Sequence, residues 1–376
     1  MRLARLKAVL LPALCAPAIP YGGQAAIEGV MMKGLRHVAL AVRRRSGEIE
    51  VMERDAKTRN PRLAAMPLVR GIVILIDMFS LGLWALQESS KRYEHDMLAA
   101  DAEKKGQPAP EAKQPSAGIG FGQQVTIVVS LIIALLVFKV LPAGLSGWIF
   151  GFFYGGPLSS IDHPTFLQQL LNNLIEGLIK MSIFVGYIWA VGRIAEIARV
   201  FEYHGAEHIV INAYEHDDTN QDIRFVQSHT TAHPRCGTSF IVILILASIA
   251  LFAVLDWLLV LAGPALTSAL PQWWLDTSWL GPAVYNNLPA WYLRWPLRII
   301  GLIPLAGISY EVIKAAFRYY GNPVLRPLLR FGMLFQALTT RRPSDDQVRV
   351  SLAAFNRARF LTEGIPEPAG TGTGTA

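Results

Sequence analysis

The amino-acid sequence predicts an α-helical integral membrane protein that has about four spans, keeps both termini in the cytoplasm and carries a small N-terminal α/β portion. Hydrophobic residues make up 52% of the 376 residues and charged residues only 17%. The mean hydropathy of +0.34 is too high for an ordinary soluble protein. Four apolar runs each approach the ~20 residues that a helix needs to cross the hydrocarbon layer. These predicted spans are residues 124–141, 174–194, 239–261 and 295–317.

The N-terminal region has the pattern of a unit outside the bilayer. Residues 1–20 place basic side chains before a short apolar run with prolines, which leaves an interfacial lead-in and a cleaved signal peptide both open. From residue 21, the closely spaced glycines of YGGQAAIEGVMMKG indicate tight turns and close backbone approach. Residues 36–53 alternate in part between apolar and polar side chains around Ser46 and Gly47, which predicts a β-hairpin. We therefore expect a small cytoplasmic α/β unit over residues 21–66.

Residues 67–99 contain an apolar stretch whose relation to the membrane is open. The stretch 67–88 is interrupted by Asp77 and has basic residues at both ends, so the charges give it no orientation. An amphipathic interfacial or re-entrant helix is the favoured interpretation, and a further span is the alternative. Residues 100–118 are charged and contain prolines, which predicts a disordered linker.

Lysine and arginine orient the predicted membrane domain, residues 119–320. Segments 142–169 and 262–292 contain neither residue, whereas the N-terminal region, the histidine-rich loop 195–238 and the C-terminal segment contain many. Because positively charged loops stay in the cytoplasm, the histidine-rich loop should face inward in a multi-pass protein of the cell inner (cytoplasmic) membrane. The net charge of +7 then indicates a phospholipid bilayer as partner. Nucleic acid is not expected, since no nucleic-acid motif accompanies the charge.

The C-terminal segment, residues 321–363, is expected to form cytoplasmic helices. Residues 321–340 mix arginines with bulky apolar side chains, as in an amphipathic helix at a membrane surface. Ser344, followed three residues later by Gln347, is the capping box of a final helix. The Gly-, Thr- and Pro-rich residues 364–376 predict a mobile tail.

Residues 201–240 form a polar insert between two apolar runs and hold five of the eight histidines. His204, Glu207 and His208 form the pattern HxxEH, in which the two histidines lie one helical turn apart on the same face. Two imidazoles so placed can hold one metal ion. Glu207 is then within reach of a metal-bound water, which is its role in the inverted zincin motif.

The same insert supplies further ligands for a divalent transition metal, with zinc as the first choice. His233 or Cys236 would be the third ligand, because a catalytic zinc usually has three protein ligands and a structural zinc four. Arg235 is placed to stabilise a developing oxyanion. A solvated histidine-rich loop without metal is the alternative. Further candidate site residues, all acids or histidines, are Glu202, Glu215, His229, Glu311 and Glu28.

These residues indicate a metal-dependent hydrolase that acts on a peptide or a lipid head group at the cytoplasmic membrane face, with Glu207 as general base. The alternative from another class is a non-catalytic membrane scaffold or assembly factor, in which a closed His/Cys site ties the loop to the spans. Transport is a third interpretation, disfavoured because the predicted spans lack a polar track.

Several motifs in one order resemble the bacterial YqhQ-like membrane family, domain of unknown function 1385, described as predicted metal-dependent enzymes. The resemblance covers residues 21–354 except the linker. It implies a metal held by His204, His208, His233 and Cys236, and it assigns no reaction. The sequence departs from the family pattern at Ala26 and at residues 341–343, away from the proposed ligands. The matching motifs are YGGQAAIEGVMMKG, PLVRG, FEYHGAEH, HPRCGTSF and QALTTRRPSDDQV.

Overall fold

The computed structural model describes most of the chain and shows a largely helical protein with one small antiparallel sheet. The described residues are 21–56, 60–106, 121–156, 158, 161, 165–234, 236–269, 288–318 and 326–366. The predicted lead-in 1–20, most of the linker, Arg235 and most of the tail lie outside them. The strands are β1 (Gly22–Ala26), β2 (Gly29–Lys33), β3 (His37–Arg43) and β4 (Ile49–Asp55). The helical elements are α2 (Pro61–Ala65), α3 (Val69–Lys104), α4 (Phe121–Leu135), η1 (Leu136–Val140), α5 (Leu141–Tyr154), α6 (Phe166–Val191), α7 (Ala195–His216), α8 (Ile223–Gln227), α9 (Gly237–Ala269), α12 (Leu288–Arg318), α13 (Arg326–Thr339) and α14 (Asp345–Glu363).

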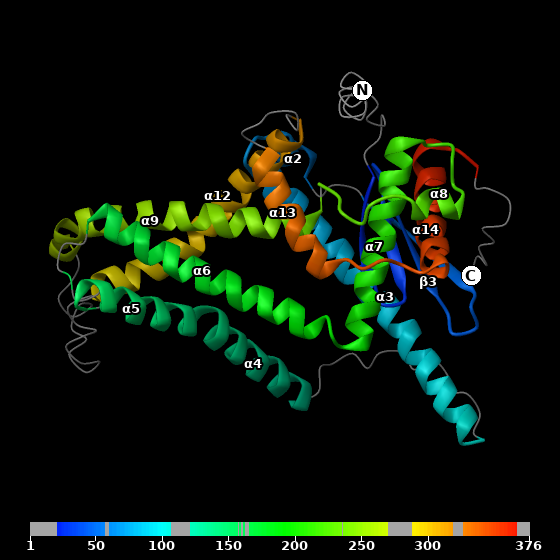
Figure 1. Ribbon diagram of the computed structural model, residues 1–376, viewed down its shortest axis with the longest axis horizontal. Coiled ribbons are helices and arrows are strands. Elements are labelled where there is room, and N and C mark those ends of the chain that lie inside the picture. Colours follow the sequence, from blue (N-terminus) through cyan, green and yellow to red (C-terminus); the bar gives the residue numbers. More distant parts are fainter. Residues whose placement is uncertain are drawn as a thin grey trace, which may run out of the picture.

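The elements separate into two ends of an elongated molecule. In Figure 1 the apolar helices α5, α6, α9 and α12 run together at one end, whereas the sheet lies with α7, α8 and α14 at the other. Helix α13 runs between the two ends. The N-terminal sheet and the histidine-bearing helix α7 therefore belong to one unit, although about 140 residues of chain separate them.

The sheet is a four-stranded antiparallel meander in the order β1-β2-β3-β4. The predicted hairpin over residues 36–53 is confirmed as β3 and β4, joined by a turn in which Gly47 has a φ of +89°. The glycine-rich segment forms a further hairpin, β1 and β2, where the sequence had indicated only turns and close approach. This hairpin turns at Glu28, whose φ of +51° is unusual for a residue with a side chain.

Both faces of the sheet are buried. Val30, Met32 and their neighbours on β3 face helices α7 and α14, whereas Met31 and Leu40 face helix α3. Successive side chains of a strand point to opposite faces, and a strand covered on both faces is apolar at every position. The sheet is therefore the middle layer of a three-layer unit.

Helix α3 is longer than predicted and has two environments. It is one of three described helices long and apolar enough to cross a membrane. Its middle nevertheless packs on the sheet, through Leu81 and Ala85, and Gly82 lies so close to Gln24 that an added Cβ would be 2.1 Å from its side chain. The helix also continues to Lys104, so the linker predicted from residue 100 begins later.

The first predicted span also extends further than expected. Helix α4 passes through the π-helical turn η1 into α5, so the chain stays helical to Tyr154 instead of leaving the span at residue 141. Pro142 lies directly after the π-helical turn, and such a turn accommodates the backbone hydrogen bond that a proline inside a helix cannot form. Gly155, with a φ of +76°, ends the helix. Among the described residues, the helices long and apolar enough to cross a membrane are Val69–Lys104, Val128–Tyr154 and Phe166–Val191, and Val242–Leu258 is a shorter apolar helix.

The described apolar helices enclose polar side chains, which corrects the expectation of spans without a polar track. Gln169, Asn173 and Glu176 are buried on α6. Asn173 Nδ2 donates to Asp256 Oδ2 of α9 at 3.1 Å, and Lys180 Nζ lies 2.5 Å from Glu176 Oε1. Polar pairs of this kind join helices in an apolar environment, so the pair of Asn173 and Asp256 contributes to the packing of α6 on α9.

Candidate metal site

The two histidines of the HxxEH pattern lie side by side on helix α7. The ring centroids of His204 and His208 are 4.5 Å apart. His208 is almost fully buried, and His204 is half-buried. Helix α7 packs on the sheet through its Glu207 side and on α14 beyond it, so the histidine face is directed at the segment before α9 and the end of α13.

Backbone carbonyl groups hold both imidazoles by the same ring nitrogen. His204 Nδ1 lies 2.9 Å from the carbonyl oxygen of Thr339, and His208 Nδ1 lies 2.5 Å from that of Thr231. A carbonyl oxygen only accepts, so each Nδ1 must carry the proton. Each Nε2 then has its lone pair free, which is the state of a metal-ligating histidine.

Cys236 completes a group of three ligands. Its Sγ atom lies 3.4 Å from His204 Nε2. One ligand atom from each of His204, His208 and Cys236 lies within 4.8 Å of the other two. Two imidazole nitrogens and a thiolate are a donor set that suits zinc and the neighbouring transition metals. Burial lowers the pKa of His208, so this ring is neutral at pH 7 and able to bind.

The loop that carries Cys236 is held from two sides. Asn212 of α7 donates to the carbonyl oxygens of Thr230 and Ala232, at 2.7 and 3.1 Å. Gln336 of α13 accepts from the His233 amide at 2.8 Å and donates to the His233 carbonyl at 2.7 Å. Both groups of the His233 backbone are thus satisfied by one buried side chain. The loop is therefore fixed before any ligand binds.

His233 lies beside the group of three but outside it. Its ring centroid is 5.7 Å from that of His208, and its Nε2 atom is 3.6 Å from a carboxylate oxygen of Glu215. That Nε2 atom is buried and has no hydrogen-bond partner among the described residues. Burial lowers the pKa of His233 to about 4. The ring of His233 is therefore neutral at pH 7 and lies next to His208, outside the group of three ligands.

Glu207 is buried between the histidines and strand β1. Burial raises the pKa of this carboxyl, while the charges of His204 and His233 and the Gly23 amide act in the opposite direction. A Cβ added at Gly23 would lie 2.9 Å from Glu207 Cγ. The glycine therefore allows the strand to approach the carboxylate, which is the close approach that the glycine-rich motif had indicated.

The remaining predicted candidates are dispersed. Glu202 accepts from Gln347 at 2.8 Å, and His229 bonds through Nδ1 to the Phe225 carbonyl at 2.9 Å. Glu311 forms a bidentate ion pair with Arg70 of α3. Glu28 lies at a separate cavity described below. Arg235 lies outside the described residues.

The sequence did not indicate the residues that position the ligands. Thr231 and Thr339 act through their carbonyl groups, so no side-chain pattern marks them. Gly205 is required because a Cβ there would lie 1.9 Å from the Arg341 carbonyl oxygen. The sequence does contain one signal for this contact, which is Gly205 itself. Glycine is unfavourable inside a helix, so its presence within the HxxEH helix indicates that another segment packs closely there.

The fold and the site together define a largely helical protein with apolar helices long enough to cross a membrane and a partly buried His/His/Cys group on α7 and the loop before α9. Residues 66–360 match the family model described as "Protein of unknown function (DUF1385)", and the chain belongs to this family. It is similar to the Bacillus subtilis (strain 168) protein described as "Uncharacterized protein YqhQ", with 31% identity over 355 residues that cover 93% of this chain and 96% of that protein. No solved structure matches the chain.

Proposed function

We propose that this protein is an integral membrane, metal-dependent hydrolase with its site at the cytoplasmic face of the cell inner membrane. The observation that supports a metal is the pair of carbonyl contacts to Nδ1 of His204 and His208, which leaves both Nε2 atoms unprotonated, with that of His204 in contact with Cys236 Sγ. Three protein ligands, with a position left for substrate or water, are typical of catalytic zinc. The proposed cofactor is a divalent transition metal, and zinc is the first candidate.

Glu207 is the proposed proton acceptor. It adjoins His208 in sequence and lies within the electrostatic influence of His204 and His233. Its burial raises its pKa, and a carboxylate with a raised pKa is a better general base near neutral pH. A bound metal would polarise the substrate and lower the pKa of water to about 7. Arg235, next to Cys236 in sequence, remains a proposed oxyanion donor.

The place of the site supports a substrate at the membrane surface. Cys236 immediately precedes helix α9, whose described part contains the apolar stretch Val242–Leu258. The ligands therefore lie where an apolar helix begins. A lipid head group or a peptide close to the membrane would reach such a site, and these are the proposed substrate classes.

The function is tested by Glu207→Gln, with Glu202→Gln as the matched control on the same helix. If Glu207 accepts a proton, the amide should abolish complementation of a strain that lacks the gene, while the purified variant keeps its metal and melting temperature. Glu202 bonds only to Gln347 among the interactions described, so its amide should complement. Full complementation by Glu207→Gln with metal retained would exclude the catalytic role.

A structural metal site in a non-catalytic membrane scaffold is the second candidate, and the position of His233 favours it. This buried ring next to His208 could close the site as a fourth ligand. The metal would then join α7 to the loop before α9, which Gln336 of α13 also holds. X-ray absorption of the metal-loaded protein distinguishes the two by the number of imidazole ligands. Three imidazoles and one thiolate indicate the scaffold, whereas two imidazoles, one thiolate and one oxygen ligand indicate the enzyme.

A further inference from the structure

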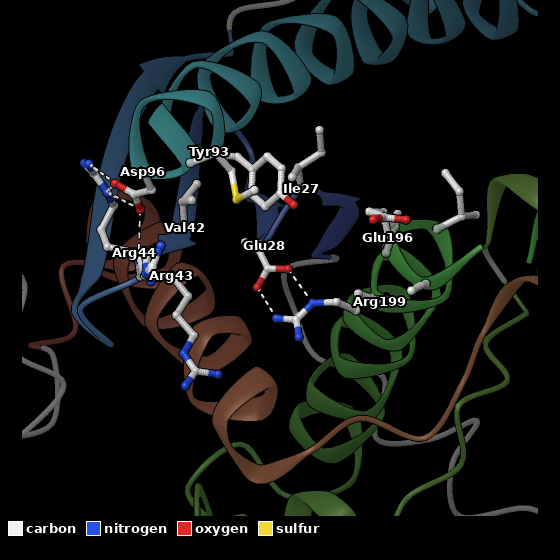
Figure 2. Close-up of a pocket in the computed structure, with 14 residues that line it drawn as sticks. Ile27, Glu28, Val42, Arg43, Arg44, Tyr93, Asp96, Glu196 and Arg199 are labelled. Atoms are coloured by element: carbon white, nitrogen blue, oxygen red, sulfur yellow. Dashed lines mark hydrogen bonds and ion pairs between the residues drawn. The ribbon is translucent and has the colours of Figure 1, made fainter. Parts of the chain in front are cut away.

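A cavity, separate from the metal ligands, lies where the sheet, helix α3 and the start of helix α7 meet. Its volume is about 670 Å³. Figure 2 shows the hairpin turn at Ile27 and Glu28, the end of β3, Tyr93 and Asp96 of α3, and the first turns of α7 around it. A volume of this size lies within the range of small-molecule pockets. The cavity therefore has room for a ligand of that class.

The cavity combines an apolar wall with an arginine-rich rim. Ile27, Val42, Met97, Ile197 and Val200 supply the apolar part. The rim carries the four guanidinium groups of Arg43, Arg44, Arg45 and Arg199 against three carboxylates, Glu28, Asp96 and Glu196. Arginine recognises phosphate through paired N–H groups, and an apolar wall beside it suits a ligand with a hydrocarbon part.

The arginines differ in how firmly protein carboxylates hold them. Arg44 bonds to Asp96 and Glu50, and Figure 2 shows it turned to that side. Arg199 and Glu28 face each other as a bidentate pair, with one contact of 2.5 Å, and the Arg199 side chain remains 49% exposed. The Arg45 backbone amide donates to Asp96 at 2.9 Å, whereas its exposed side chain has no acidic partner among the described residues. Arg45 and Arg199 are thus the rim groups able to bind an incoming anion.

The cavity opens at the level where the apolar helix α6 ends. Only residues 192–194 separate Val191, the last residue of α6, from Ala195, which lines the cavity. At this end of α6, the Arg193 guanidinium lies 4.0 Å from the centre of the exposed Trp189 ring. Tryptophan and arginine at the end of an apolar helix mark the head-group layer of a bilayer. Ala195, Glu196 and Met97 are exposed, so the cavity is accessible at that level.

From these contacts we infer that the cavity binds the phosphate of an anionic ligand, with Arg45 and Arg199 on the phosphate and the apolar wall beside a hydrocarbon chain. A head group of membrane phospholipid and a soluble phosphate share this chemistry, and the position at the end of α6 favours the lipid. Arg199 and Tyr203 hold Glu28 on the face of α7 that also carries Glu207. The lining of the cavity ends at Val200 on α7 and does not include His204, His208 or Cys236, so the cavity is separate from the metal ligands.

The test measures binding to the delipidated full-length protein in detergent by native mass spectrometry. The probes are dihexanoylphosphatidylglycerol and, as a phosphate-free control with the same chains, dihexanoylglycerol. The phosphatidylglycerol should bind and the diglyceride should not. Arg45→Gln and Arg199→Gln should each weaken binding about tenfold, since each removes a charged hydrogen-bond donor. Arg36→Gln, an exposed arginine outside the cavity, is the matched control and should bind as the wild type does.

Glu28→Gln should change the affinity for phosphatidylglycerol in the opposite direction. Removing this carboxylate frees Arg199 from its protein partner, so phosphatidylglycerol should bind more tightly, whereas a purely structural ion pair predicts no gain. Competition by millimolar inorganic phosphate would identify a soluble phosphate as the source, and its absence would identify the lipid. Equal binding of the diglyceride, or wild-type affinity in Arg45→Gln and Arg199→Gln, would overturn the inference. The Arg45 side chain has no ion pair among the described residues, and Arg45→Gln keeps the backbone bond to Asp96, so this variant remains informative even if Arg199→Gln fails to fold.

Discussion

His204 Nδ1 lies 2.9 Å from the carbonyl oxygen of Thr339, the last residue of α13. This contact joins the histidine-bearing helix to the amphipathic C-terminal helix, 135 residues further along the chain. It also assigns the proton of His204 to Nδ1 and directs Nε2 to Cys236. The orientation of a ligand therefore depends on where α13 ends, and the chain continues past Gly205 at a distance that only glycine allows.

The first prediction concerns metal content. Purified protein should contain about one equivalent of a transition metal, because three ligand atoms converge within 4.8 Å. His204→Ala, His208→Ala and Cys236→Ser should each lose most of it. His229→Ala is the control, since this histidine of the same polar segment bonds to the Phe225 carbonyl instead. Elemental analysis is the measurement, and stoichiometric metal in a His204→Ala, His208→Ala double variant would show that the ligands are wrong.

The second prediction concerns the side chain that holds the loop. Gln336→Leu removes both hydrogen bonds to the His233 backbone, so it should lower metal affinity on the order of 10 to 100-fold without removing a ligand. Gln221→Leu is the matched control, because it also loses two hydrogen bonds, both to Asn356 on α14. The control should lower the melting temperature and leave metal affinity unchanged, as titration with a competing chelator would show.

Much of the fold follows from local pattern. Ser344 and Gln347 form the predicted capping box of α14, and the Ser46–Gly47 turn joins the predicted hairpin. The first hairpin was harder to predict because its second strand is apolar on both faces and therefore lacks the alternation of a half-exposed strand. The extent of the first span was underestimated because Pro142 resembles a helix end, and the π-helical turn before it has no sequence signal.

In the candidate site, too, local spacing could be predicted from the sequence and contacts distant in sequence could not. The spacing of His204 and His208 on one helix is local, so the sequence could place these two residues together. The addition of Cys236 depends on a loop position that Asn212 and Gln336 determine through contacts distant in sequence. His229 is also a histidine of this polar insert and was therefore an equally good candidate ligand by residue type. Its ring nevertheless lies beside His216 and Phe225, away from the metal ligands. Composition identifies possible ligands, and the backbone contacts decide among them.

The third prediction concerns acid stability at the contact of helix α3 with the sheet. The hydrogen bonds from Arg44 lower the pKa of Asp96. Burial alone would raise the pKa of Glu50, but the hydrogen bonds from Arg44 and Arg92 outweigh burial, so that pKa is also lowered. A carboxyl group whose pKa is lower in the folded than in the unfolded state stabilises the fold at a pH above its unfolded-state pKa of about 4. This stabilisation is lost as the pH falls from that pKa through the lower folded-state pKa.

Arg44→Gln should therefore reduce stability by about 1 kcal/mol at pH 7, since the groups are partly exposed. Its melting temperature should approach that of the wild type as the pH is lowered from 5 to 3. Arg36→Gln, which lacks a described ion pair, should follow the wild type throughout. A difference between Arg44→Gln and wild type that stays constant across this range would show that the ion pairs do not carry the effect.

The last prediction concerns topology, where helix α3 is the open element. It is long and apolar enough to cross a membrane, yet Leu81 and Ala85 pack on the sheet, whose other face packs on α7. A helix held along its middle by a folded sheet cannot have that part in lipid. Lys104 at the end of α3 and His216 at the end of α7 should thus be on one side of the membrane, the cytoplasmic side by the distribution of positive charge.

Single cysteines at Lys104, His216 and Gly156 test this arrangement with a membrane-impermeant thiol reagent, after subtraction of the signal from the parent protein. In intact cells only Gly156→Cys, in the connection between α5 and α6, should react, because that segment carries no Lys or Arg. All three should react in opened cells. Labelling of Lys104→Cys from outside, with His216→Cys still protected, would show that α3 crosses the membrane and that its contact with the sheet is not present in the cell.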